Sequence, residues 1–259
     1  MIALTGAAGG VGSILTRGLR RDLRLLDIRP APGCDLLDVR DLAAVEAAFS
    51  GIDAVIHLGA IPTEAPFEDI LDHNLRGTYN VLEAARRRGV RRVVFASSNH
   101  VTGMYGRAER VGPEDPIRPD TYYGVSKAFG EALGALYSDK HGMVVTCLRI
   151  GNVGPRPLDV RRLSIWVSPE DIVQLIRIGL EHPGIRFEIV YGASDNAASW
   201  WDNSRARQLG YRPTGKAEDH RAHAEAEQAK IGPDPVGDLF QGGAFCSAEF
   251  TNDVKRAGP

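Results

Sequence analysis

The sequence predicts an α/β fold, in which a doubly wound parallel sheet precedes a small C-terminal lobe. In the first two-thirds of the 259-residue chain, short apolar runs alternate with amphipathic stretches of helical periodicity. The runs are rich in Val, Ile and Leu and apolar on both faces, which is typical of parallel strands buried between two layers of helices. After Gly151 this alternation gives way to segments rich in Pro and Arg. Strand–helix alternation with right-handed crossovers places helices on both faces of one sheet.

The expected elements follow in chain order. Strands are expected at residues 2–5, 23–27, 54–58, 93–97 and 144–150, and helices at 10–21, 42–49, 67–88 and 120–141. Ser168 and Pro169 then provide an N-cap and a first helical residue for a helix to about Glu181, followed by a strand near 187–191. Residues 217–230 are helical in composition, and the Gly/Pro-rich tail 232–259 is expected to be irregular. We expect residues 1–151 to form the sheet domain, with the strand near 187–191 continuing its sheet, and residues 152–259 to form mainly the small lobe and tail, folded with it as one unit.

Composition excludes several classes of function. Lys and Arg number 31 against 33 Asp and Glu, a formal charge of −2, which argues against a broad nucleic-acid interface. The three cysteines show no CxxC spacing, so neither a disulfide framework nor a zinc site is indicated, and no metal is expected. The chain begins directly with a strand-like segment and has no apolar run of membrane-spanning length. We therefore expect a cytoplasmic protein without membrane or nucleic-acid partners.

A glycine-rich segment between the first strand and the first helix predicts a dinucleotide site. Gly6, Gly9 and Gly12 form a GxxGxxG pattern in which Gly10 and Val11 are embedded. Glycines there permit a tight turn and let a pyrophosphate approach the helix N-terminus, as in Rossmann-type domains. A plain tight turn is the alternative.

An acidic residue ends the second expected strand. Asp27 is placed to bind the adenosine ribose diol and to repel a 2′-phosphate, which favours NAD over NADP. Arg29 lies close enough in sequence to weaken that preference. An ordinary solvated carboxylate at a strand end is the alternative for Asp27.

A tyrosine and a lysine four residues apart indicate acid–base chemistry. On a helix, Tyr123 and Lys127 share a face, and a nearby ammonium favours the phenolate form, so we expect Lys127 to lower the pKa of Tyr123. Tyr122 has no such partner, because its +4 position is Ser126. Ser98 follows the fourth expected strand, where its hydroxyl could bind the reacting oxygen. The YxxxK spacing alone is common. It becomes a specific signal for a catalytic pair when it follows the fourth strand of a sheet whose first strand ends in the glycine pattern.

With these motifs the sequence resembles the extended short-chain dehydrogenase/reductase superfamily, the NAD-dependent epimerase/dehydratase family. The 25-residue interval between Ser98 and Tyr123 is similar to that of its sugar-modifying branch. Six further segments resemble the bacterial uronate dehydrogenases, nearly from end to end of the chain. They lie at residues 96–100, 123–127, 161–166, 192–194, 200–203 and 240–245.

The resemblance implies NAD-dependent oxidation of C1 of a hexuronate, D-galacturonate or D-glucuronate, to an aldarolactone. Tyr123 would take the anomeric hydroxyl proton, Lys127 would hold the nicotinamide ribose, and Ser98 would orient the anomeric oxygen. The resemblance assigns ring hydroxyls to Asn99 and His100, the substrate carboxylate to Arg161, and closure of the pocket to Phe245. The implied cofactor contacts are Ile28, Asp35 and Leu36 around the adenosine, Leu58, Gly59 and Ala60 at the pyrophosphate and ribose, Asn74 and Ser97 nearby, and Ile150 and Asn152 at the nicotinamide.

Two positions depart from the resembled enzymes, and several alternatives stay open. Pro62 and Asn152 stand where small hydroxyl residues are usual, which bears on substrate preference rather than on reaction class. Arg156 and Arg162 compete with Arg161 as carboxylate ligands. The alternative functions are a dehydrogenase or epimerase for another sugar and a non-catalytic NAD-sensing protein. The sequence does not rank the two uronates, and the helices at 67–88 and 120–141 suggest a homo-oligomer.

Overall fold

The computed structural model describes residues 1–254, and its centre is one seven-stranded sheet in which every neighbouring pair is parallel. The strand order is β3-β2-β1-β4-β5-β6-β9, so the order reverses between β1 and β4. Ligands of open α/β sheets bind at such a reversal, beyond the carboxyl ends of the strands. The strands are β1 (Ile2–Thr5), β2 (Leu23–Asp27), β3 (Cys34–Leu36), β4 (Ala54–His57), β5 (Arg92–Ser98), β6 (Val144–Ile150) and β9 (Phe187–Gly192).

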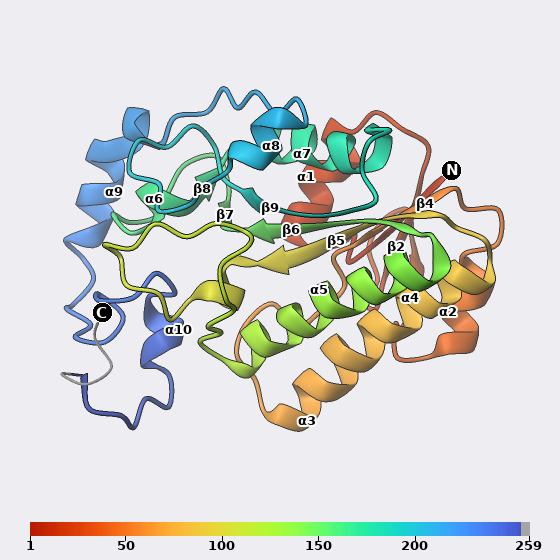
Figure 1. Ribbon diagram of the computed structural model, residues 1–259, viewed down its shortest axis with the longest axis horizontal. Coiled ribbons are helices and arrows are strands. Elements are labelled where there is room, and N and C mark those ends of the chain that lie inside the picture. The colour runs from red at the N-terminus through yellow and green to blue at the C-terminus, as the bar shows by residue number, and fades with distance from the viewer. Residues whose placement is uncertain (255–259) are drawn as a thin grey trace.

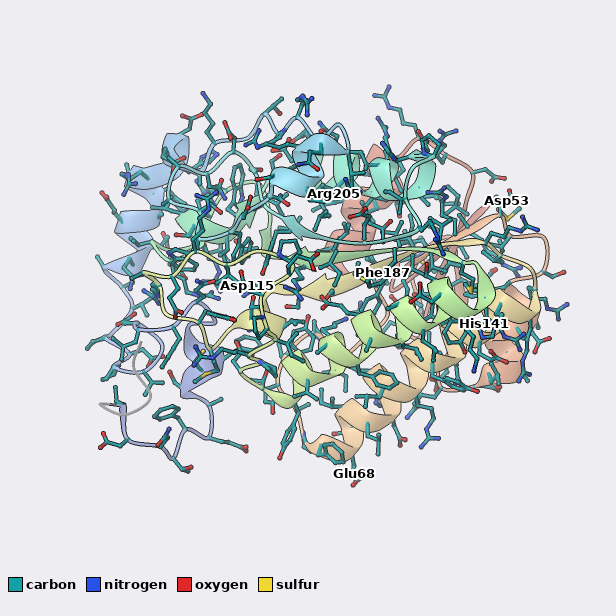
Figure 2. The ribbon with its side chains drawn as sticks, viewed as in Figure 1. Asp53, Glu68, Asp115, His141, Phe187 and Arg205 are labelled. Carbon is teal, nitrogen blue, oxygen red and sulfur yellow. The ribbon has the colours of Figure 1, made fainter. Side chains whose placement is uncertain are left out.

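Helices cover both faces of this sheet, which confirms the predicted fold class (Figure 1). Helices α2 (Leu42–Ala48), α4 (Gly77–Arg87) and α5 (Tyr122–His141) lie on one face, and α1 (Gly10–Gly18) and α7 (Pro169–Glu181) on the other. Successive strand residues alternate between the two cores: Ala3 and Val55 join the first, and Leu4 and Ile56 join the second. Phe187 packs on the first core beside α5 (Figure 2).

The boundaries of the long helices follow from local chemistry. The Thr121 side chain accepts a hydrogen bond from the Gly124 backbone N–H, and Gly142 ends α5 in the left-handed region. Ser168 caps α7 and Pro169 is its first residue, as predicted. The helix expected at 67–88 is instead divided into α3 (Phe67–Ile70), a π-helical stretch (Leu71–Arg76) and α4. Such widened turns often mark functional positions.

The C-terminal part of the chain gathers at the carboxyl ends of the strands (Figure 1). The structure adds short elements that the sequence did not predict, namely β3, the two-stranded sheet of β7 (Asn152–Val153) and β8 (Trp166–Val167), and α6 (Arg162–Ile165), α8 (Ser204–Gln208) and α10 (Ala244–Ser247). The helical segment expected at 217–230 is a 3-10 turn (Ala217–His220) followed by α9 (Arg221–Gln228). Residues 255–259 of the expected tail lie outside the described residues. Within residues 1–254, every helix is too short or too polar to cross a membrane.

Candidate active site

The glycine loop between β1 and α1 has the close backbone contacts that a pyrophosphate site requires. Gly6 has φ +74°, and a Cβ there would lie 2.8 Å from the Gly59 nitrogen. A Cβ on Gly12 would collide with the carbonyl oxygens of Gly6 and Ala7. At Gly10 a Cβ would meet nothing within 4 Å. Gly6 and Gly12 are therefore fixed by backbone contacts, and Gly10 is not.

Asp27 ends β2 beside this loop and is 5% exposed, which excludes the solvated-carboxylate alternative. Its Oδ2 accepts the Ala8 backbone N–H at 2.9 Å, and its Oδ1 accepts the Arg29 backbone N–H at 2.9 Å. The Arg29 Nε lies 3.4 Å from the same Oδ1. Asp27 thus holds the glycine loop, and a cation lies next to it.

One large cavity, which we call the main cleft, has a volume of about 830 Å³ and runs along the carboxyl ends of β1, β2, β4 and β5. Most of the predicted cofactor residues line it: Gly6, Gly9, Gly10, Val11, Gly12, Asp27, Ile28, Leu58, Gly59, Ala60, Ser97, Tyr123, Lys127 and Ile150. Asp35 and Leu36 do not line it, and Leu37, Asp38 and Val39 take that position. Asp35 instead pairs with Arg24 at 3.2 Å on the outer strands of the sheet.

Asn74 is predicted near the cofactor, but the structure places it beneath the loop that follows β4. Its side chain is 1% exposed and makes three hydrogen bonds: it accepts from Ile61 N–H at 2.8 Å and donates to the Ile61 carbonyl at 3.0 Å and to Ser126 Oγ at 3.1 Å. Asn74 lies in the π-helical stretch, so the widened turn holds the loop that lines the main cleft.

Tyr123 and Ser98 meet at the inner end of the main cleft. Tyr123 is 8% exposed, and burial raises its pKa to about 12 against the opposing effect of a hydrogen bond with Ser98. Ser98 ends β5, and its Oγ also accepts the His100 backbone N–H at 3.2 Å. The neighbouring Ser97 hydroxyl donates instead to Glu131 at 2.6 Å, beneath the cleft. Of the two serines, Ser98 is therefore the one that hydrogen-bonds Tyr123.

Lys127 lies on the same face of α5 as Tyr123. Its Nζ donates to the Ala96 carbonyl at 2.8 Å and lies 5.5 Å from the centre of the Tyr123 ring. Burial lowers the pKa of Lys127 to about 8. The expected lowering of the Tyr123 pKa by Lys127 is not found, because desolvation of the phenolate dominates in this cavity.

A second cavity, the side pocket, adjoins the main cleft at Asn99, His100 and Gly151 and has a volume of about 240 Å³. Three predicted residues that do not line the main cleft line this pocket: Asn152, Arg161 and Phe245. Three buried polar atoms in it have no hydrogen-bond partner among the described residues: Asn99 Nδ2, Asn152 Oδ1 and Arg161 Nη2. Buried polar groups are normally paired, so these atoms indicate a polar, anionic ligand.

Arg161 is one of three arginines that line the side pocket, with Arg107 and Arg162. Its Nε donates to the Gln241 carbonyl at 2.8 Å, and burial lowers its pKa to about 10. The competing Arg162 is paired with Asp159, and Arg156 does not line the pocket. Of these three arginines, only Arg161 has a buried guanidinium nitrogen without a partner among the described residues.

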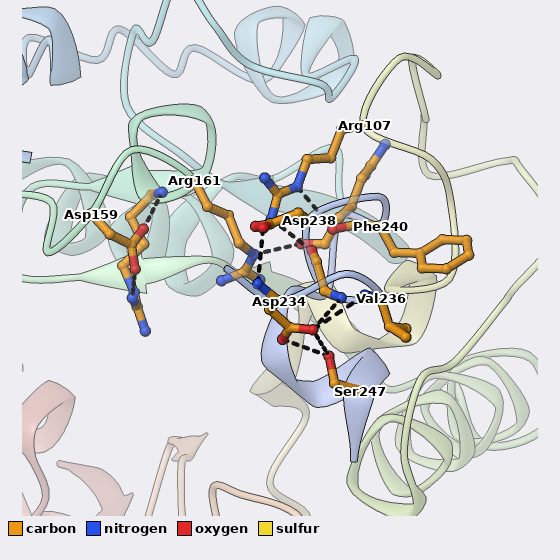
Figure 3. A network of polar contacts seen from close by, with 11 residues as sticks. Arg107, Asp159, Arg161, Asp234, Val236, Asp238, Phe240 and Ser247 are labelled. Carbon is orange, nitrogen blue, oxygen red and sulfur yellow. Dashed lines mark hydrogen bonds and ion pairs between the residues drawn. The ribbon is translucent and has the colours of Figure 1, made fainter. Parts of the chain in front are cut away.

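Residues 234–247, which we call the tail loop, close the side pocket (Figure 3). Arg107 donates to the Phe240 carbonyl at 3.1 Å and to the Gly237 carbonyl at 2.6 Å. The Asp234 carboxylate accepts the Ser247 hydroxyl and the Gly237 N–H. At its far end Phe245 stacks on His100, with ring centres 3.8 Å apart. The tail loop is thus held by Arg107 and by the stack on His100. It places the Phe245 ring with its centre 6.2 Å from the centre of the Tyr123 ring.

Sequence reasoning missed the residues that hold this site in place. The Glu64 carboxylate accepts the backbone N–H groups of Tyr122 and Tyr123, at 3.2 and 2.9 Å. Gln241 donates to the Gly106 and Glu109 carbonyls at 3.1 and 2.9 Å. These partners are far apart in sequence, so no local pattern could have indicated them. His57 lies beneath this site and is structural, since Thr5 Oγ1 lies 2.7 Å from its Nδ1 and burial lowers its pKa to about 3.

Comparison with known proteins agrees with this geometry. Residues 2–168 match the NAD dependent epimerase/dehydratase family. The chain is 46% identical to the uronate dehydrogenase of Pseudomonas putida, over 95% of this chain and 96% of the relative. It is 39% identical to the L-arabinose 1-dehydrogenase (NAD(P)(+)) of Haloferax volcanii, over 82% of this chain and 95% of that one. A mutant uronate dehydrogenase from Agrobacterium tumefaciens complexed with NAD superposes with a TM-score of 0.90 at 43% identity, over 95% of this chain and 96% of that chain.

Proposed function

The chain belongs to the NAD dependent epimerase/dehydratase family, and from that premise we propose that it is a uronate dehydrogenase, which oxidises C1 of a hexuronate to an aldarolactone with NAD⁺. The observation that carries the proposal is the Arg161 Nη2 in the side pocket, which has no hydrogen-bond partner among residues 1–254. A guanidinium binds a carboxylate with two parallel hydrogen bonds. A sugar whose anomeric carbon lies at Tyr123 would extend its carboxylate into this pocket.

The main cleft fits NAD⁺. The backbone of Gly6 and Gly12 leaves no space for a side chain, and such a cradle suits a pyrophosphate. Asp27 would hold the adenosine ribose, and Lys127 the ribose next to the nicotinamide. When bound, NAD⁺ supplies the acceptor for the hydride that leaves C1.

Two side chains, Tyr123 and Ser98, carry out the proton transfer in this proposal. Tyr123, as phenolate, takes the proton of the anomeric hydroxyl while the C1–O bond gains double-bond character. Ser98 bonds both the phenol and, in the reaction, the anomeric oxygen, so it aligns donor and base. Burial opposes the phenolate, so activity of the free enzyme should rise with pH above neutrality, as more Tyr123 ionises. Phe245 and the tail loop exclude water from C1.

The test is a substrate panel. Purified protein with NAD⁺ should reduce the cofactor, measured by absorbance at the NADH band, with D-galacturonate, D-glucuronate or both. D-Galactose and L-arabinose, which lack the carboxylate, should be turned over at least about a hundredfold less efficiently. Parallel assays with NADP⁺ measure how strictly Asp27 selects NAD⁺. No turnover of either uronate refutes the proposal, and efficient turnover of L-arabinose would favour the sugar dehydrogenase alternative.

We further propose a homo-oligomer in the cytoplasm. Helices α4 and α5 expose Tyr79, Tyr122, Val125 and Leu136, a set of large apolar side chains that a second copy would cover. Cys147 and Cys246 are buried free thiols, which suits a reducing compartment. Light scattering after size-exclusion chromatography measures the mass, and Tyr79→Arg with Val125→Arg should reduce it to 28.0 kDa.

A further inference from the structure

A histidine–aspartate pair stands beside the reacting tyrosine. The His100 Nδ1 and the Asp120 Oδ2 are 2.6 Å apart. The His100 ring lies edge-on to Tyr123, with ring centres 5.8 Å apart, and stacks on Phe245. His100 lines both the main cleft and the side pocket. Its ring therefore forms the boundary between the hydride-transfer position and the carboxylate position.

The Asp120 carboxylate is enclosed without a cation. Its side chain is 0% exposed, and among residues 1–254 no lysine or arginine forms an ion pair with it. A Cβ on Gly103 or on Gly242 would collide with it, so two distant segments leave space for this carboxylate. Thr121 Oγ1 donates to its other oxygen at 2.9 Å. Burying a carboxylate is unfavourable unless it is hydrogen-bonded. The hydrogen bond of Asp120 with His100 is therefore needed to stabilise the carboxylate, and it constrains the imidazole in turn.

The chemistry of the pair determines the state of the imidazole. A carboxylate only accepts hydrogen bonds, so the proton of the neutral ring lies on Nδ1. Nε2 is then an acceptor, and no partner for it is found in the described part of the chain. The stack on Phe245 fixes the plane of the His100 ring, and the hydrogen bond with Asp120 fixes the orientation of the ring within that plane.

We propose that Asp120 is a positioning residue that holds His100 as the Nδ1–H tautomer, so that Nε2 accepts a hydrogen bond from a hydroxyl of the bound sugar. The proposal rests on the proposed function, because that hydroxyl belongs to the uronate. It assigns to Asp120 a role in substrate affinity although the carboxylate touches no substrate.

The first test is kinetic. Asp120→Asn and His100→Ala should each raise the KM for the uronate about tenfold and leave the KM for NAD⁺ within twofold. In the double variant, the KM should equal that of His100→Ala, because Asp120 acts only through His100. The matched control is Asp171→Asn, since Asp171 is equally buried and accepts a 2.6 Å bond from Ser194 away from both cavities. This control should lower the unfolding temperature and leave both KM values within twofold. A wild-type KM in Asp120→Asn, or additive effects in the double variant, would overturn the proposal.

The second test does not depend on activity. In protein labelled with ¹⁵N-histidine, the ring nitrogen shifts of His100, assigned by their loss in His100→Ala, should report the Nδ1–H tautomer. In Asp120→Asn they should report a tautomer mixture or Nε2–H. An unchanged tautomer refutes the role of Asp120 even where no uronate is oxidised, whereas a wild-type enzyme that shows the tautomer but oxidises no uronate refutes only the proposed function.

Discussion

The main cleft and the side pocket share Asn99, His100 and Gly151 but are built in opposite ways. The main cleft is made largely of backbone at the ends of successive strands, and its tightest contacts join the Gly6 loop to the Gly59 loop. The side pocket is made largely of residues from the turn after β5, the loop at Arg161 and the tail loop, and three of its polar atoms have no partner among residues 1–254. A backbone cradle binds any dinucleotide of the right shape, whereas unpaired side-chain atoms select one functional group. Mutations should therefore separate cofactor binding from substrate binding.

The largest effect is expected at Tyr123, which lines the main cleft beside Ser98. Tyr123→Phe keeps the ring and removes the phenolic oxygen that we propose takes the substrate proton, so kcat should fall about a thousandfold or more. NAD⁺ affinity, measured by calorimetry, should stay within threefold, because the ring still fills the same space. A variant with more than a tenth of the wild-type kcat would remove Tyr123 from the chemistry and revive the NAD-sensing alternative.

The next effect tests whether the side pocket selects the carboxylate. Arg161→Ala should raise the KM for the uronate about a hundredfold, the order expected when a charge-assisted double hydrogen bond is lost. NAD⁺ affinity should not change, since Arg161 does not line the main cleft.

Arg107→Ala is the control for this variant. Arg107 also holds the tail loop through the carbonyls of Gly237 and Phe240. If the Arg161 effect came only from loosening this loop, the two variants would behave alike. We expect a rise in KM of less than tenfold in Arg107→Ala, and equal effects would contradict the carboxylate assignment.

The same contrast explains what the sequence could predict. The glycine loop, Asp27 and the Tyr123–Lys127 pair lie at strand ends or on one helix face, so spacing along the chain determines their placement. Asp120 and Glu64 could not be found in this way, because each acts on a site residue through contacts that only the folded chain forms. Asp35 and Leu36 were expected at the adenosine, but β3 ends at Leu36 and the chain reaches the main cleft only at Leu37. The ionisation of Tyr123 was also beyond the sequence, since it depends on burial.

A smaller effect tests the backbone construction of the main cleft. Gly6→Ala places a Cβ 2.8 Å from Gly59 N at a φ of +74°, so it should destabilise the protein by about 2 kcal/mol and weaken NAD⁺ binding about tenfold. Gly10→Ala is the matched control, because a Cβ there meets nothing within 4 Å. Thermal unfolding and calorimetry measure both variants. Equal effects at Gly6 and Gly10 would mean that the loop is not held by this contact.

The last effect concerns the stability that the protein loses because the Lys127 ammonium is buried. The pKa of Lys127 is lowered to about 8 by burial, from 10.5 in the unfolded chain. Between these values the unfolded chain holds a proton that the folded chain has released, so the contribution of Lys127 to stability improves as pH rises from 8 to 10. Lys127→Met removes the charge, so the variant should be more stable than the wild type at pH 7, by at most about 3 kcal/mol. This difference should shrink steadily as the pH rises from 8 to 10. Denaturant unfolding at four pH values measures the difference, and one that is independent of pH would mean that Lys127 keeps its ordinary pKa in the folded protein.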